Sequence, residues 1–279
     1  MLKRLTIITD GICMVLFMLA LFFFAMPIKN GYCGEPVSII EDVREIELQK
    51  IKCDEQKDDY FGYVKGHIPI LISAPHGAKH YRLSERRWKA EDAYTSSFAI
   101  KLGELTGAYV IYTRNKANED PNSDIHCRYK DFLGRVVKEN GIKFIVDIHG
   151  ASRDRKFKID VGTMDNITAK SSCPTFMPLI DKAFRDFDEG TFNKHFQAKG
   201  LGTITYFARN DLGIEAAQFE INALYRIIES RSNPAVRAKE QDVLDIMRRM
   251  QVMISDINEK IAQDFSANQQ LVSRLHSNP

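Results

Sequence analysis

Short apolar runs alternate with longer amphipathic segments along most of the chain. The runs at 70–74, 109–112 and 144–148 are rich in Ile, Val, Tyr and Phe and lie close to Pro or Gly, which is typical of buried strands. Further strands are predicted at 159–164, 203–207 and 217–221, and helices at 90–105, 129–139 and 178–187. This alternation predicts an α/β domain with a largely parallel sheet, whose ligand site lies at the carboxyl ends of the strands.

The last long element is a predicted helix that begins at Asn233-Pro234, a capping residue followed by the proline favoured at the first helical position. Its apolar residues recur at spacings of three and four: Val243, Met247, Met250, Ile254, Ile257 and Ile261. This stripe favours a helix packed on the sheet. A dimerising coiled coil is the alternative, over only about three heptads, and the oligomeric state stays open.

The N-terminal segment differs in composition from the rest. Residues 12–26 carry no charge and follow Lys3 and Arg4, a pattern that indicates an export signal. The segment is shorter than the roughly 20 residues of a membrane span, which favours a cleaved signal peptide over a permanent anchor. We therefore expect a signal peptide or anchor (1–33), a polar linker with an edge segment (34–66), one catalytic domain (67–266) and a flexible tail (267–279). The protein is expected to be periplasmic or secreted, with membrane contact only through 12–26.

Charge and cysteine content exclude several classes of partner and site. Residues 1–33 contain Lys3, Arg4 and Lys29 against Asp10, which accounts for the whole net charge of +2, so the remainder sums to zero. No nucleic-acid partner is implied. Without the predicted signal peptide three cysteines remain (Cys53, Cys127 and Cys173), with no CxxC spacing. They predict neither a disulfide scaffold nor a cysteine metal cluster, although one bridge in an oxidising compartment stays open.

Two histidines occupy equivalent places: His76 and His149 each directly follow a predicted strand and precede a glycine. Neutral imidazole is a good zinc ligand, and two strand ends of one parallel sheet face the same edge. Taken alone, each would more often be a hydrogen-bonded structural residue, and it is the pair that favours a metal site. Asp147 points to the same side of its strand as His149 and could orient a ligand or position the next loop.

A catalytic zinc site takes three protein ligands and leaves one position for water. Glu91 and Asp92, at the start of the helix after the first strand, could each supply the third ligand. The alternative is a favourable charge at a helix N-terminus.

A carboxylate also interrupts the apolar run 217–221. Glu220 is costly to bury there unless it has a function, and beside a metal that function is general base. The alternative is an ion pair with Arg226. Asn222 and Arg226 could instead anchor a substrate carboxylate.

Together these segments resemble the N-formylglutamate amidohydrolase family, in the family's order, between residues 68 and 226. The matching segments are Ile72-Ser73-Ala74-Pro75-His76-Gly77, Glu91-Asp92 with Tyr94-Thr95, Val146-Asp147-Ile148-His149-Gly150, and Gln218-Phe219-Glu220-Ile221-Asn222 with Tyr225-Arg226. The resemblance implies a zinc carboxypeptidase-like (phosphorylase/hydrolase-like) fold, with a mixed sheet flanked by helices, one zinc ion and a glutamate base.

Carried over by position, the resemblance implies His76, His149 and Asp92, rather than Glu91, as zinc ligands, and Glu220 as the catalytic glutamate. Asp120-Pro121-Asn122 is a weakened form of the family's substrate-side motif, and Arg128 is a candidate for holding a carboxylate. The HxxE spacing of the carboxypeptidases is absent because Lys79 occupies that place.

The expected function is therefore an exported zinc amidohydrolase that cleaves an N-acyl amino acid or small peptide. Export argues against the breakdown of a cytoplasmic metabolite. The alternative is a non-catalytic periplasmic ligand-binding protein with the same fold. The remaining histidines of this part of the chain are predicted to be surface or structural residues: His67, His80, His126 and His195.

Overall fold

The structure is a computed structural model that describes residues 36–51, 59–165, 171–230 and 236–277. The predicted signal peptide, Cys53 and the predicted helix start at Asn233-Pro234 lie outside the described residues. None of the described helices is both long and apolar enough to span a bilayer.

A seven-stranded sheet forms the centre of the fold, in the order β1-β5-β2-β6-β9-β7-β8. Four strands run parallel at its centre, β1 and β7 pair antiparallel with their inner neighbours, and β8 is parallel to β7. This confirms the predicted mixed, largely parallel sheet. The strands are β1 (Phe61–Val64), β2 (Ile70–Ala74), β5 (Tyr109–Thr113), β6 (Phe144–Ala151), β7 (Ile159–Gly162), β8 (Gly190–Phe192) and β9 (Glu215–Asn222).

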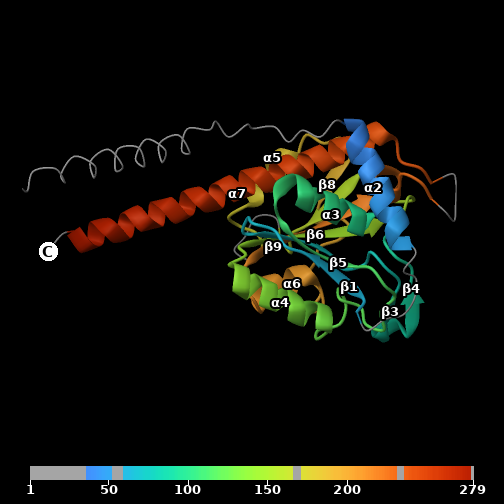
Figure 1. Cartoon of the computed structure of the whole chain (residues 1–279), viewed down its shortest axis with the longest axis horizontal. Helices are drawn as coiled ribbons and strands as arrows, with labels where there is room; N and C mark the ends of the chain where they lie inside the picture. The colour runs from blue at the N-terminus through green and yellow to red at the C-terminus, as the bar shows by residue number, and fades with distance from the viewer. Residues whose placement is uncertain (1–35, 52–58, 166–170, 231–235, 278–279) are drawn as a thin grey trace, which may run out of the picture. The chain divides into compact units, whose positions relative to one another are not determined.

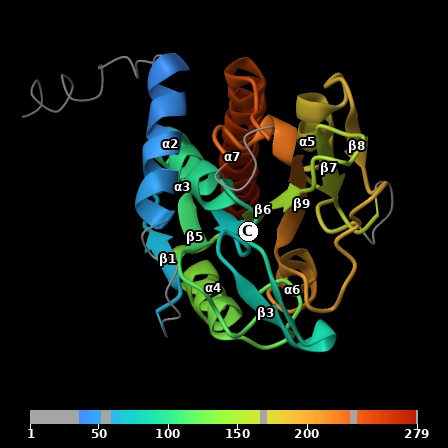
Figure 2. The ribbon, with the colours of Figure 1, turned by 90° about the vertical axis from the view of Figure 1, so that its right-hand side faces the viewer.

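Helices cover both faces of the sheet (Figures 1 and 2). Alternate side chains of each strand point to opposite faces, so that Ile70 and Ile72 join one hydrophobic cluster and Leu71 joins the other. The first cluster is covered by α2 (Pro36–Ile51), α3 (Thr95–Thr106), α5 (Met177–Phe184) and α7 (Glu240–Ser277), and the second by α4 (Arg128–Asn140) and α6 (Ile204–Asn210).

Between β2 and α3 the chain forms a small hairpin of β3 (His80–Arg82) and β4 (Arg87–Lys89), joined by the 3-10 turn η1 (Leu83–Glu85). A second 3-10 turn, η2 (Ala223–Tyr225), follows β9.

Three predicted elements differ in the structure. The polar linker contains α2, because Ile40, Val43 and Glu47 are spaced as one helix face and are buried. The predicted strand at 203–207 is α6, whose first turn is capped by Thr203 accepting a hydrogen bond from the backbone N–H of Tyr206. The segment 267–277, expected to be a flexible tail, continues α7.

The start of α3 also differs from the prediction. The helix begins at Thr95, after Tyr94 in the left-handed region with φ of 69°. Asp92 therefore lies in the turn before the helix, where its carbonyl accepts the N–H of Thr95 at 3.1 Å. This turn lies beside the carboxyl end of β2 and so places Asp92 next to His76.

Candidate metal centre and its pocket

The candidate centre lies at the carboxyl ends of β2, β6 and β9. His76 follows β2, and β2 pairs with β6, which carries His149 near its end. His149 is in turn the register partner of Glu220 on β9. Three neighbouring parallel strands therefore bring together two histidines and the buried carboxyl group that the sequence singled out.

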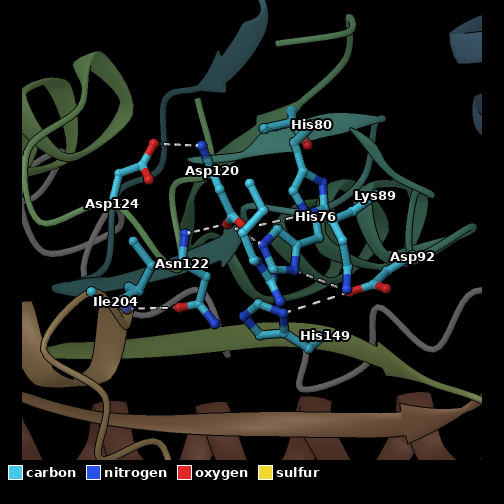
Figure 3. A network of polar contacts seen from close by, with 12 residues as sticks. His76, His80, Lys89, Asp92, Asp120, Asn122, Asp124, His149 and Ile204 are labelled. Atoms are coloured by element: carbon cyan, nitrogen blue, oxygen red, sulfur yellow. Dashed lines mark hydrogen bonds and ion pairs between the residues drawn. The ribbon is translucent and has the colours of Figure 1, made fainter. Parts of the chain in front are cut away.

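Asp92 faces both histidines through one oxygen atom (Figure 3). Its Oδ2 lies 3.5 Å from His76 Nδ1 and 3.6 Å from His149 Nδ1. Backbone hydrogen bonds fix this position, because Asp92 N–H donates to His76 O at 2.8 Å and Gly150 N–H donates to Asp92 Oδ2 at 3.1 Å. The planes of the two imidazole rings make an angle of 80°, and this geometry allows both Nδ1 atoms to point to one ion. Glu91 is exposed and does not belong to this group.

The other nitrogen of each histidine faces a buried carboxylate. His76 Nε2 lies 2.7 Å from Asp120 Oδ1, and His149 Nε2 lies 3.0 Å from Asp147 Oδ2. Such contacts fix the tautomer and the ring orientation of a metal-binding histidine and raise its basicity. In this tautomer the Nδ1 atom of each histidine keeps its lone pair, so both Nδ1 atoms can bind a metal ion. The sequence suggested that Asp147 could orient a ligand, and its contact with His149 fits that role. It did not suggest this role for Asp120.

A second group of candidate ligands consists of His76, His80 and Asp120. The two rings of this group are stacked, with centroids 4.0 Å apart and planes within 6°. A metal lies close to the plane of each imidazole that binds it, at about 2.0–2.1 Å from nitrogen, and two stacked parallel rings share no such point. The centre with Asp92 and His149 is therefore the better metal site. His80 packs as a buried residue against His76, with its Nδ1 3.1 Å from Ala78 O.

Asp120 also receives a hydrogen bond from Arg82, whose Nε lies 2.6 Å from Asp120 Oδ2. We expect Asp120→Asn to lower the affinity for Zn²⁺ about 10–100-fold, because the neutral amide no longer favours the tautomer of His76 that exposes Nδ1. Competition with a chromogenic chelator measures this affinity. The control is Glu85→Gln, which alters another partner of Arg82 but does not touch His76. Equal affinities in Asp120→Asn and wild type would remove this role for Asp120.

Glu220 is buried beside the centre. Burial raises the pKa of its carboxyl group to about 7, with the His149 charge acting in the opposite direction. A carboxyl group with a pKa near neutrality is suited to general-base catalysis. Gln218, two residues earlier on the same face of β9, donates a hydrogen bond from Nε2 to Glu220 Oε1 at 2.8 Å.

The centre opens into a pocket of about 590 Å³, lined by His76, Asp92, His149 and Glu220. Its other charged lining residues are all basic: Arg82, Lys89, Arg155 and Lys199, together with His195. Sequence reasoning missed these residues, and it placed His195 among surface or structural positions. The side chain of His195 is indeed exposed, but it stacks on Phe157 at the pocket wall, with ring centroids 5.0 Å apart.

The loop that carries His195 is held by one buried carboxylate. Asp160 on β7 is fully buried, and its Oδ2 accepts the backbone N–H groups of His195 at 2.8 Å and Phe196 at 2.7 Å. Its Oδ1 accepts the hydroxyl of Thr191 at 2.7 Å. This part of the pocket wall is therefore fixed from the sheet.

The three residues predicted to bind substrate do not line this pocket. Arg226 is buried and donates hydrogen bonds to the carbonyl groups of Ala93, Ala151 and Ile221, so its guanidinium group joins the turn before α3 to the ends of β6 and β9. Asn222 Nδ2 donates to the carbonyl of Arg155 at 2.8 Å, which positions a residue that does line the pocket. Arg128 is exposed and pairs with Glu119 at 3.2 Å.

The sequence matches no protein-family model and no curated protein. Among solved structures, the chain is similar to an N-formylglutamate amidohydrolase from Ralstonia eutropha JMP134, with 13% identity and a TM-score of 0.53 over 74% of this chain and 99% of that one. It is also similar to a bacteriophage poly-gamma-glutamate hydrolase, with 15% identity and a TM-score of 0.46 over 76% and 95% of the two chains. The first likeness shows that the chain shares the fold of that protein, which is the fold that the sequence resemblance predicted.

Proposed function

We propose that the protein is a zinc-dependent amidohydrolase that cleaves the amide bond of an N-acyl amino acid or small peptide with a free carboxylate. The observation that carries this proposal is the convergence of His76 Nδ1, His149 Nδ1 and Asp92 Oδ2 beside the buried Glu220. Two histidines and a carboxylate form a common ligand set of catalytic zinc. A zinc ion held by this set would supply Lewis acidity, polarising the substrate carbonyl and lowering the pKa of a water molecule.

Glu220 performs the proton transfers in this proposal. As a carboxylate it takes a proton from the attacking water while the oxygen forms a bond to the carbonyl carbon. It then returns the proton to the leaving nitrogen as the carbon–nitrogen bond breaks, so that the products are a carboxylic acid and an amine. The hydrogen bond from Gln218 to Glu220 Oε1 holds the carboxylate in one orientation, with Oε2 left for the water.

The basic wall of the pocket supports a substrate with a free carboxylate. Arg82, Lys89, Arg155 and Lys199 line the pocket, whereas its acidic lining residues are the proposed ligand Asp92 and the proposed base Glu220. Arg82 and Lys89 are also paired with Glu85 of the hairpin. Arg155, positioned by Asn222, is therefore the strongest candidate for a bidentate contact with a substrate carboxylate.

Export remains part of the proposal, and its support is the uncharged segment 12–26 behind Lys3 and Arg4. The mass of the mature protein and its recovery from a cell fraction would test it. A full-length product retained in the cytoplasm would contradict it.

The activity is tested with the zinc-loaded protein and a panel of N-formyl, N-acetyl and short peptide derivatives of glutamate and aspartate. Release of free amine, measured with an amine-reactive dye and abolished by a chelator, would support the proposal. Zinc bound in the pocket, with tight binding but no turnover of the whole panel, would favour the non-catalytic binding protein instead.

Substrate recognition by Arg155 gives a separate prediction. We expect Arg155→Met to raise KM about tenfold or more for the best acidic substrate, because a charged hydrogen bond contributes roughly 1.5–3 kcal/mol. The KM for the side-chain amide of the same substrate, which lacks the second negative charge, should rise much less. Arg153→Met is the control, because this neighbouring arginine does not line the pocket. An equal rise in KM for the charged and the amidated substrate would show that Arg155 does not bind the carboxylate.

A further inference from the structure

Gln218 shares the face of β9 that carries Glu220, and both side chains line the pocket. Only 4% of Gln218 is exposed. Its Nε2 lies 2.8 Å from Glu220 Oε1. An ionised carboxylate is only an acceptor, so the amide must turn its NH₂ group toward Glu220. The same contact therefore directs the amide oxygen of Gln218 away from the Glu220 oxygen that accepts this hydrogen bond.

The amide oxygen of Gln218 is buried and has no hydrogen-bond partner within the described part of the chain. The residues paired with Gln218 on the neighbouring strands are Asp147 on β6 and Gly162 on β7. Neither can satisfy it through a side chain, because the Asp147 carboxylate is an acceptor and Gly162 has no side chain. A buried amide oxygen without a partner costs roughly 1–3 kcal/mol. Because Gln218 lines the pocket, a ligand donor that reaches this oxygen would satisfy it.

We propose that Gln218 Oε1 accepts the N–H of the scissile amide and thereby orients the leaving nitrogen toward Glu220. This inference rests on the proposed function. When the carbonyl carbon becomes tetrahedral, the nitrogen lone pair must face the proton held by Glu220, and a hydrogen bond to the remaining N–H fixes that orientation. Gln218 is thus a specificity-determining residue that selects secondary amides over esters and over amides of N-alkylated residues such as proline.

The experiment compares two small zinc chelators, acetohydroxamate and N-methylacetohydroxamate, which differ in the N–H at the position of the scissile nitrogen. Their dissociation constants are measured by calorimetry on the zinc-loaded full chain. We expect the wild type to bind acetohydroxamate about tenfold more tightly, because it alone can donate to Gln218. In Gln218→Met, which removes the amide at similar volume, the two probes should bind within about twofold of each other.

The control variant is Gln197→Met, which changes another pocket-lining glutamine whose amide donates to the carbonyl of Asn193. It should keep the tenfold preference. A Gln218→Met protein that retains the preference would overturn the inference, and equal binding of the two probes by the wild type would do the same. A wild type that holds no zinc and binds neither probe would overturn the proposed function itself. Zinc content and melting temperature of each variant separate these outcomes from misfolding.

Discussion

Asp92→Ala is expected to abolish zinc binding, whereas Glu91→Ala is expected to leave about one zinc per chain. The two acids are neighbours, but only Asp92 places an oxygen between the Nδ1 atoms of His76 and His149. Without it, two neutral imidazoles remain, and a site that has lost one of its three protein ligands and its negative charge holds the ion poorly. Metal analysis after gel filtration, on proteins purified side by side, measures the difference.

Asp92 also contributes to structure, because its Oδ2 accepts the N–H of Gly150 and its backbone joins the turn to His76. Asp92→Asn is therefore the companion variant: the amide oxygen can still accept from Gly150, but the negative charge is lost. We expect it to fold normally and to bind zinc much more weakly than the wild type. Full zinc content in Asp92→Ala, or loss of zinc in Glu91→Ala with a normal melting temperature, would contradict the ligand set.

The parts of the site that lie on strands could be predicted from the sequence. His76 and His149 each follow an apolar run, and neighbouring parallel strands end at the same edge. Glu220 was identified for a similar reason, since a carboxylate within a buried strand must have a partner or a function. A period of two along a strand also fixes which residues share its face, which placed Asp147 on the same side of its strand as His149.

Apart from Asp92, which the family resemblance identified, the parts of the site that depend on loops could not be predicted. His195 reaches the pocket because buried Asp160 holds the backbone of its loop, a contact between positions 35 residues apart. Asp120 reaches His76 across 44 residues. Arg226 looked like an anchor for a substrate carboxylate, but the charge pattern does not reveal that three backbone carbonyls surround its guanidinium group. In each case, tertiary contacts that leave no periodic signal in the sequence decide the role.

Glu220→Gln is expected to lower kcat by about 10²–10⁴-fold while zinc content stays unchanged. The substitution keeps the size of the side chain and an oxygen that can accept the hydrogen bond from Gln218, but a carboxamide cannot take a proton from water at neutral pH. Glu220 does not belong to the candidate ligand group, so we expect the variant to bind zinc as the wild type does. Turnover of the best panel substrate and metal content are measured on the same preparation.

The matched control is Glu215→Gln, an acidic residue at the other end of the same strand. Its side chain accepts the backbone N–H of Thr175 at 3.1 Å, and glutamine can preserve that bond. This variant should retain wild-type kcat. The comparison separates proton transfer from the strand's stability, because both substitutions remove one negative charge from β9 but only one of them lies beside His149. An active Glu220→Gln enzyme would exclude Glu220 as the base, and the water would then have to lose its proton to another group in the pocket.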